Sequence, residues 1–95
     1  MVAHGETPLG LAAREGAARA VAGEGRVHVL FQPHLFSRTR EFWREFADAL
    51  SLADTALVLD IYPAREEPLP GVTSALVADA LNTAGGLATA AGAPE

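Results

Sequence analysis

The stretch VHVLFQPHLFSRTR, residues 27–40, decides the fold of this chain. Its first half is an apolar run in which alternate side chains belong to opposite faces of a strand. The two faces carry Val27, Val29 and Phe31 and, opposite them, His28 and Leu30. A strand that is apolar on nearly both faces is typical of a buried strand in a parallel sheet. The stretch therefore predicts an α/β fold.

A polar turn and a charged helix follow this strand. Pro33 ends the strand because proline has no N–H to donate to a neighbour. Ser37 or Thr39 can cap the helix that follows. An open α/β sheet binds ligands where a strand ends and a helix begins, so we expect the functional site near this turn.

A second apolar run, residues 55–61, stays almost continuously apolar until Asp60. The 23 residues between Phe31 and Thr55 contain one predicted helix, which is the length of a crossover connection. The apolar stripe of this helix consists of Phe42, Phe46, Ala49, Leu50 and Ala53, with Trp43 at the margin. This order predicts a right-handed β-α-β crossover. The turns at residues 32–34 and 60–62 then lie at the same edge of the sheet, on strands about 4.8 Å apart.

Two more helices are predicted, one before and one after this unit in the sequence. The first begins with Thr7 as its cap and Pro8 at its first position, and it ends at Gly23 and Gly25. Its apolar residues keep roughly helical spacing: Leu9, Ala12, Ala13, Ala17, Ala20 and Val21. The last helix is predicted over residues 72–81.

The predicted fold class is α/β: an incomplete Rossmann-like β-α-β unit with two parallel strands and three helices. Residues 1–6 are predicted to be irregular. The domain is expected to span residues 1–81, followed by a flexible Gly/Ala-rich tail, residues 82–95, that contains no strand. A two-stranded sheet is marginal and exposes its edges. We therefore expect the chain to be part of a larger domain, or to form a homodimer through the open sheet edges.

The composition excludes several classes of function. The 95 residues, 49% of them hydrophobic, suffice for one small globular domain. No apolar run approaches the roughly 20 residues needed to cross a bilayer, so we expect no membrane partner. The absence of cysteine and of a secretory signal favours the cytoplasm. A net charge of -5 disfavours a nucleic-acid partner. All seven basic residues are arginine, so the chain lacks the lysine of a phosphate-binding loop.

Two motifs carry a resemblance to a known family. The strings FQPHLFSRT, residues 31–39, and DIYPAREEPLPGV, residues 60–72, are similar to the C-terminal domain of the Mur ligases, which build peptidoglycan. The resemblance runs from about residue 3 to 81 and is strongest to the members that join L-alanine to UDP-N-acetylmuramate. It implies an ATP- and Mg²⁺-dependent ligase whose central and N-terminal domains are missing here. The chain alone is expected to bind neither ATP nor Mg²⁺ and to be inactive.

The resemblance implies a substrate site at the two strand tips. It gives Arg38, in the pattern QPHxxSRT, the role of binding the amino-acid substrate, which agrees with the ability of a helix start and a guanidinium to hold a carboxylate. His34 could contact the substrate, orient Arg38 or bond the turn backbone. Asp60 and Tyr62 are expected to face the same crevice, and the alternative for Asp60 is a structural role in which it bonds the helix or loop opposite. The alternative for Arg38 is a surface ion pair with Glu41 or Glu45.

Two further candidates come from the resemblance alone. Glu66 matches the family pattern, although a solvated rim is its simpler interpretation. His4 matches part of a Tyr-Ala-His-His-Pro turn of the family, in which Gly5 and Glu6 replace the second histidine and the proline. No catalytic residue is assigned, and no metal site is expected, because the spacing of His4, His28 and His34 fits no structural zinc pattern.

These observations leave two functions open. The first is the substrate-binding C-terminal portion of the ligase. The second is a non-catalytic Rossmann-like remnant that binds a partner or associates with itself. Binding of L-alanine, and its dependence on Arg38, would distinguish the two.

Overall fold

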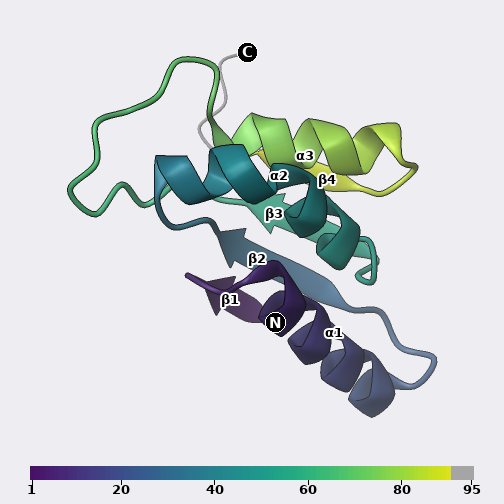
Figure 1. Cartoon of the computed structure of the whole chain (residues 1–95). Coiled ribbons are helices and arrows are strands. Elements are labelled where there is room, and N and C mark those ends of the chain that lie inside the picture. Colours follow the sequence, from purple (N-terminus) through teal and green to yellow (C-terminus); the bar gives the residue numbers. More distant parts are fainter. Residues whose placement is uncertain (91–95) are drawn as a thin grey trace.

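The fold is a four-stranded, all-parallel sheet with strand order β1-β2-β3-β4 and three helices (Figure 1). The computed structural model describes residues 1–90. The strands and helices alternate along the chain as β1 (Val2–His4), α1 (Pro8–Ala22), β2 (His28–Gln32), α2 (Phe36–Leu50), β3 (Thr55–Val58), α3 (Ser74–Thr83) and β4 (Ala88–Ala90). The predicted α/β class and the parallel pairing of the strands at residues 28–32 and 55–58 are confirmed.

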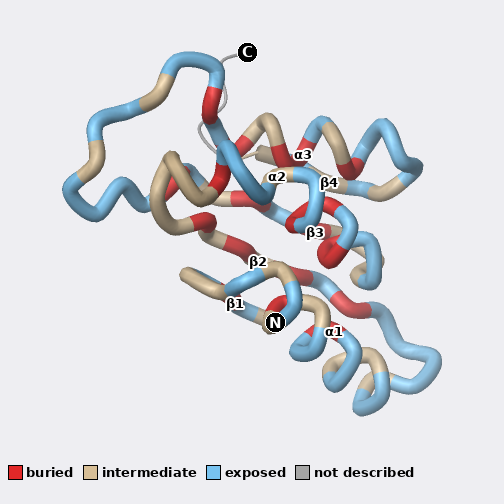
Figure 2. Tube along the Cα trace, viewed as in Figure 1, coloured by how far each residue is buried: buried red, intermediate tan, exposed pale blue. Residues whose placement is uncertain are grey.

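The helices cover one face of the sheet. Each strand pairs with the next strand in the sequence, and right-handed crossovers place every connecting helix on the same side. The inward side chains of this face are buried: Ala3, Val29, Phe31, Ala56 and Val58. Figure 2 shows the buried residues concentrated where the central strands meet the helices. The opposite face carries the alternate residues of each strand and is covered by no helix of the described part.

The core forms between the covered face of the sheet and α2. The rings of Phe31, from β2, and Phe46, from α2, lie 5.1 Å apart at a tilt of 43°. Both side chains are almost completely buried, which stabilises the fold by about 1.5–3 kcal/mol for each side chain. The predicted apolar stripe of α2 is confirmed at Phe46, Ala49 and Leu50, whereas Phe42 is exposed.

Both edge strands correct the sequence prediction. Residues 1–6 were expected to be irregular, yet β1 pairs with β2, with Leu30 N donating to Met1 O at 2.8 Å. The region after residue 81 was expected to contain no strand, yet β4 pairs with β3, and Ala56 N donates to Leu87 O at 2.9 Å. Strands of three residues are too short to show a periodicity, and alanine does not signal a strand. Residues 91–95 of the predicted tail lie outside the described residues.

The buried face of α1 also differs from the prediction. Thr7, whose side chain accepts a hydrogen bond from Gly10 N, and the C-terminal Gly23 confirm the predicted ends. The buried residues, however, are Leu11 and Glu15, while Leu9 is 82% exposed. An alanine-rich helix has no strong apolar stripe, so its packing against α2 selects the face that is buried.

The helix ends near the predicted site were only partly foreseen. Helix α2 begins at Phe36, after Leu35 in a left-handed conformation with φ 71°, so neither Ser37 nor Thr39 occupies the cap position. Thr39 instead donates its hydroxyl to Leu35 O at 2.9 Å inside the first turn. Among residues 1–90, no helix has the length and apolar character needed to span a membrane.

Candidate functional site

The candidate site lies at the carboxyl edge of the sheet, where β2 and β3 end. Beyond the strands the two chains stay side by side: Tyr62 N donates to Pro33 O at 2.9 Å, and Leu35 N donates to Tyr62 O at 2.8 Å. The turns at residues 32–34 and 60–62 therefore meet at one edge, as the crossover predicted. This double connection fixes the backbone that carries His34 and Tyr62.

Three aromatic rings form a row across this edge. The ring of His34 stacks on that of His4, with centroids 5.5 Å apart and an interplanar angle of 24°. On its other side, the ring of His34 lies 5.0 Å from that of Tyr62. The row thus joins the end of β1 to the segments that follow β2 and β3. The structure brings three of the candidate residues together in this way.

Gly5 makes a close approach of the His34 ring to the backbone after β1 possible. A Cβ atom at this position would lie 2.8 Å from Nδ1 of His34, which is closer than real side-chain contacts allow. Its backbone φ of +65° is also a value that residues other than glycine rarely adopt. The sequence analysis noted Gly5 only as a departure from the family's turn and did not give it a place in the site. Its signal in the sequence was a glycine two residues before the predicted helix cap, Thr7.

Arg38 extends toward the same row from the first turn of α2. Its Nη1 donates a long hydrogen bond, 3.4 Å, to Gly5 O, and the side chain is partly buried. The expected alternative, an ion pair with Glu41 or Glu45, is not present among the ion pairs of residues 1–90. A guanidinium has five N–H donors, so this one contact leaves Arg38 able to bind a carboxylate as well.

The surroundings of His34 favour its neutral form. Burial, followed by the charges of His4 and Arg38, holds the pKa of His34 below its ordinary value of 6.5. A neutral imidazole has one nitrogen that donates and one that accepts a hydrogen bond. His34 can therefore offer an acceptor next to the cationic Arg38.

Glu66 occupies the N-terminus of α2. Its carboxylate accepts a hydrogen bond from Ser37 N at 3.1 Å and a short one from the Ser37 hydroxyl. These bonds, with the hydroxyl contributing most, and a further one from Phe36 N hold the pKa of Glu66 below its usual value. Glu66 is thus the cap of α2, supplied from the loop between β3 and α3. Because its charge fills the helix start, an anion bound at the site would rely on Arg38.

Asp60 is the candidate that the structure does not join to the others. It is exposed, and its backbone carbonyl accepts a hydrogen bond from Nε2 of Gln32 at 3.2 Å. Its carboxylate makes no ion pair within residues 1–90. The expectation that Asp60 faces the same crevice as Arg38 therefore has no contact in its favour. It follows β3 at the predicted edge, but apart from the row of rings.

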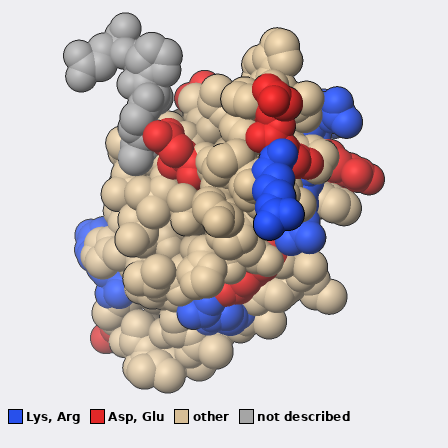
Figure 3. Space-filling model, turned by 90° about the vertical axis from the view of Figure 1, so that its left-hand side faces the viewer, with Lys and Arg blue, Asp and Glu red and all other residues tan. Residues whose placement is uncertain are grey.

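The charges around the site are mixed in sign. Figure 3, turned to face the side of the loop between β3 and α3, shows acidic and basic side chains interspersed. An anionic ligand would therefore be held by local contacts and not by a broad positive field. No group of three or more His, Cys, Asp or Glu residues able to hold a metal ion occurs in the described part of the chain.

Comparison with known proteins relates most of this chain to one kind of enzyme. The relatives include the UDP-N-acetylmuramate–L-alanine ligases of Paenarthrobacter aurescens, 72% identical over 74 residues, and of an Arthrobacter species, 64% identical over 83 residues. The ligase of Cutibacterium acnes is 62% identical over 80 residues. The resemblance to the Mur ligases is confirmed.

The matches cover most of this chain but little of each relative. They include 78%, 87% and 83% of the chain, and 16%, 18% and 17% of the three ligases in the same order. The chain thus spans about a sixth of the length of the curated relatives that it matches. No family model matches the chain.

Proposed function

We propose that this chain is the amino-acid-binding, C-terminal portion of an ATP-dependent ligase that joins L-alanine to UDP-N-acetylmuramate in peptidoglycan synthesis. One observation carries the proposal: in a chain 72% identical to such a ligase over 74 residues, Arg38 extends to a row of aromatic rings at the carboxyl edge of a parallel sheet. Open α/β sheets bind their ligands at this edge.

The proposed ligand is the zwitterionic amino acid. The guanidinium of Arg38 binds its carboxylate with a charge-assisted pair of hydrogen bonds. His34, kept neutral by its surroundings, accepts a hydrogen bond from the ammonium group, and His4 and Tyr62 restrict the space on either side of it.

The chemical step is assigned to parts of the ligase outside this chain. The chain has no lysine, and its described residues contain no cluster able to hold a metal, so its residues do not fit an ATP–Mg²⁺ site. In the full enzyme the carboxylate of UDP-N-acetylmuramate is activated elsewhere, and this portion presents the amine by proximity. Alone, the chain is expected to release no phosphate from ATP when both substrates are added.

Calorimetric titration with L-alanine and with L-alaninamide tests the proposed site. The acid should bind and the amide should not, because only the acid offers a carboxylate to Arg38. Arg38→Ala should weaken binding about 10- to 100-fold, which corresponds to the roughly 1.5–3 kcal/mol of a charged hydrogen bond. Arg40→Ala, an exposed arginine two residues away on α2, is the matched control and should bind like the wild type. Equal loss in both variants, or binding of neither ligand, would refute the site.

The second candidate function, a non-catalytic module that associates with itself, is favoured by a different observation. One whole face of the sheet lies outside the helical layer, and it lies apart from the proposed amino-acid site.

A further inference from the structure

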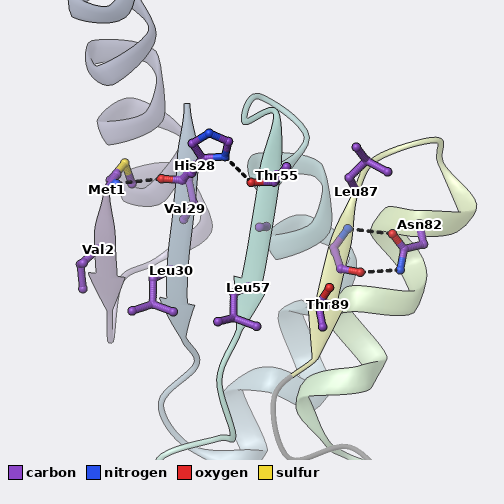
Figure 4. A pocket seen from close by; sticks show the side chains of 12 residues that line it. Met1, Val2, His28, Val29, Leu30, Thr55, Leu57, Asn82, Leu87 and Thr89 are labelled. Carbon is purple, nitrogen blue, oxygen red and sulfur yellow. Dashed lines mark hydrogen bonds between the residues drawn. The ribbon is translucent and has the colours of Figure 1, made fainter. Parts of the chain in front are cut away.

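The uncovered face of the sheet is apolar. Val2 on β1 is 59% exposed and Leu57 on β3 is 38% exposed, with Leu30 of β2 between them (Figure 4). Parallel sheets are found almost only with both faces covered, because exposed apolar strands are unfavourable in water. Some surface is therefore expected to cover this face.

Two hollows mark the extent of the uncovered surface. One of about 640 Å³ follows the middle of the face, and one of about 560 Å³ lies beside the C-terminal half of α1. Twelve residues line the first and eight line the second, with Met1 and His28 common to both, so the two form one continuous surface of 18 residues. We call these 18 residues the open surface.

The open surface is nearly free of charge. Arg26 is its one residue with an ionised side chain, and the Met1 ammonium group is occupied by a hydrogen bond to His28 O at 2.7 Å. Two of its polar side chains form a hydrogen bond with each other, since His28 Nδ1 lies 2.5 Å from the Thr55 hydroxyl. Of the eight large apolar side chains exposed in residues 1–90, four belong to this surface. A patch of this kind marks an interaction site.

The two sheet edges, by contrast, are closed by side chains. Arg14 Nη2 donates to the outward-facing Val2 O of β1 at 2.8 Å. At the other edge, Asn82 both donates to Ala88 O and accepts from Ala88 N, each at 2.8 Å, so its amide occupies the groups of β4 that another strand would need (Figure 4). Proteins use such devices to prevent edge-to-edge association. The homodimer through open edges, expected from the sequence, is therefore disfavoured at these positions.

We propose that the open surface is the interface of a two-fold dimer of this chain. The partner must itself be apolar and almost uncharged, because any charged group placed here would lose its water without gaining a counter-charge. A second copy meets this requirement by symmetry, since each copy buries the same patch of the other. Fifteen of the 18 residues are not buried within one copy, which is fewer than the 20–30 per partner of a standard stable interface, so the dimer is expected to dissociate on dilution. The remaining surface, with the charges that give the chain its net charge of -5, stays in water.

Sedimentation velocity of the 95-residue chain over a wide range of concentrations tests the dimer. Wild type should sediment as a dimer that dissociates on dilution, and Leu57→Asp should sediment as a monomer throughout. Leu52→Asp is the matched control: Leu52 is a leucine of similar exposure, 46%, outside the open surface, and its variant should still form the dimer. Leu57→Asp could unfold the chain, so a second variant is needed. Thr89→Arg replaces an already exposed polar residue of the surface. It should also sediment as a monomer, with an unchanged circular dichroism spectrum.

Thiol labelling provides a second readout that needs no disruptive charge. The natural sequence has no cysteine, so Leu57→Cys introduces a single thiol on the surface and Leu52→Cys introduces a single thiol away from it. The proposal requires that labelling of Leu57→Cys slow as protein concentration rises, while labelling of Leu52→Cys does not.

Several results would overturn the proposal. A monomer at every concentration would do so, as would open-ended aggregates in place of a dimer. A dimer that survives both Leu57→Asp and Thr89→Arg would assign association to another part of the molecule. If the wild-type chain is monomeric and Leu57→Cys is instead protected by adding the remainder of a related ligase, another part of such an enzyme covers the surface. The proposal is independent of the amino-acid site, because L-alanine titrations of dimer and monomer variants would report on that site separately.

Discussion

At the scale of single residues, Glu15 is the most unexpected member of the core. It lies on the buried face of α1 with none of its side chain exposed, and neither carboxylate oxygen has a hydrogen-bond partner within residues 1–90. Burial, followed by the negative charge of Glu6, raises the pKa of Glu15 from 4.5 to about 7. The folded chain therefore holds a proton that the unfolded chain releases between these two values.

The first prediction concerns the pH dependence of stability. Because the folded-state pKa of Glu15 is raised, its contribution to the free energy of unfolding is most favourable below pH 4.5, falls as the pH rises to about 7, and is flat above. The total change is roughly 3 kcal/mol. Glu15→Gln should remove this fall, as measured from urea midpoints at a series of pH values. Glu41→Gln, on the exposed face of α2, should retain it. A wild-type slope in Glu15→Gln would contradict the assignment.

The second prediction contrasts two glycines. Gly5→Ala forces a Cβ against His34 at a positive φ, so it should lower the free energy of unfolding by about 1–3 kcal/mol. Gly16→Ala, inside α1 with no atom within 4 Å of the new Cβ, should instead raise it by up to about 1 kcal/mol. Urea unfolding measures both. A Gly5→Ala chain as stable as the wild type would show that the close approach of His34 to Gly5 is not rigid.

At the scale of secondary-structure elements, α2 depends on a cap from a distant part of the chain. Leu35 at its N-cap provides no side-chain acceptor, and Glu66 supplies the carboxylate from the loop after β3. The third prediction is that Glu66→Gln accelerates hydrogen exchange of the Phe36 and Ser37 amides. Since the pKa of Glu66 is lowered, the cap is present above its unfolded pKa and is lost as the pH falls, so wild type and variant should converge in acid. Glu67→Gln, on the exposed neighbour, should exchange like the wild type.

The elements that the sequence predicts well are those with a clear period and enough length. The two central strands and α2 carry large apolar residues at regular spacing, and their crossover correctly places His34 and Tyr62 at one edge. The edge strands were missed because each gains its backbone partners from a neighbour, and three residues show no period. The role of Glu66 could not be foreseen either, because a cap 29 residues away leaves no local pattern.

The candidate site also combines features that the sequence predicts with features that it does not. The proximity of Arg38 to the rings follows from topology, because a helix that begins just after a strand must start at the edge where that strand ends. The contact between Arg38 and Gly5 depends on β1, which the sequence did not reveal. Asp60 also follows a strand at this edge, yet its side chain takes no part in the row, since position along the chain does not fix the direction of a side chain outside a strand.

At the scale of the whole molecule, the helices of residues 1–90 cover one face of the sheet and leave the other face uncovered. The helical layer covers one face of the sheet and side chains close its edges, while the open surface is suited to burial. The proposed amino-acid site and the open surface use different parts of the molecule, since the first lies beyond the strand ends and the second lies across one face of the sheet and beside α1. Both can therefore be occupied at once.

The last prediction tests how far the folded unit extends beyond the domain predicted over residues 1–81. If the region after residue 81 were a mere appendage, a chain ending at Thr83 would unfold at the same urea concentration as the whole chain. The structure predicts a lower midpoint, because truncation removes β4, exposes the hydrogen-bonding groups along β3 and uncovers the buried Leu81, which packs under the turn at Gly86.

Asn82→Ala, which removes only the amide that holds Ala88, should lower the free energy of unfolding by about 0.5–1.5 kcal/mol. Thr83→Ala, an exposed neighbour, should have no comparable effect, and an unchanged midpoint in the truncated chain would restore the shorter domain.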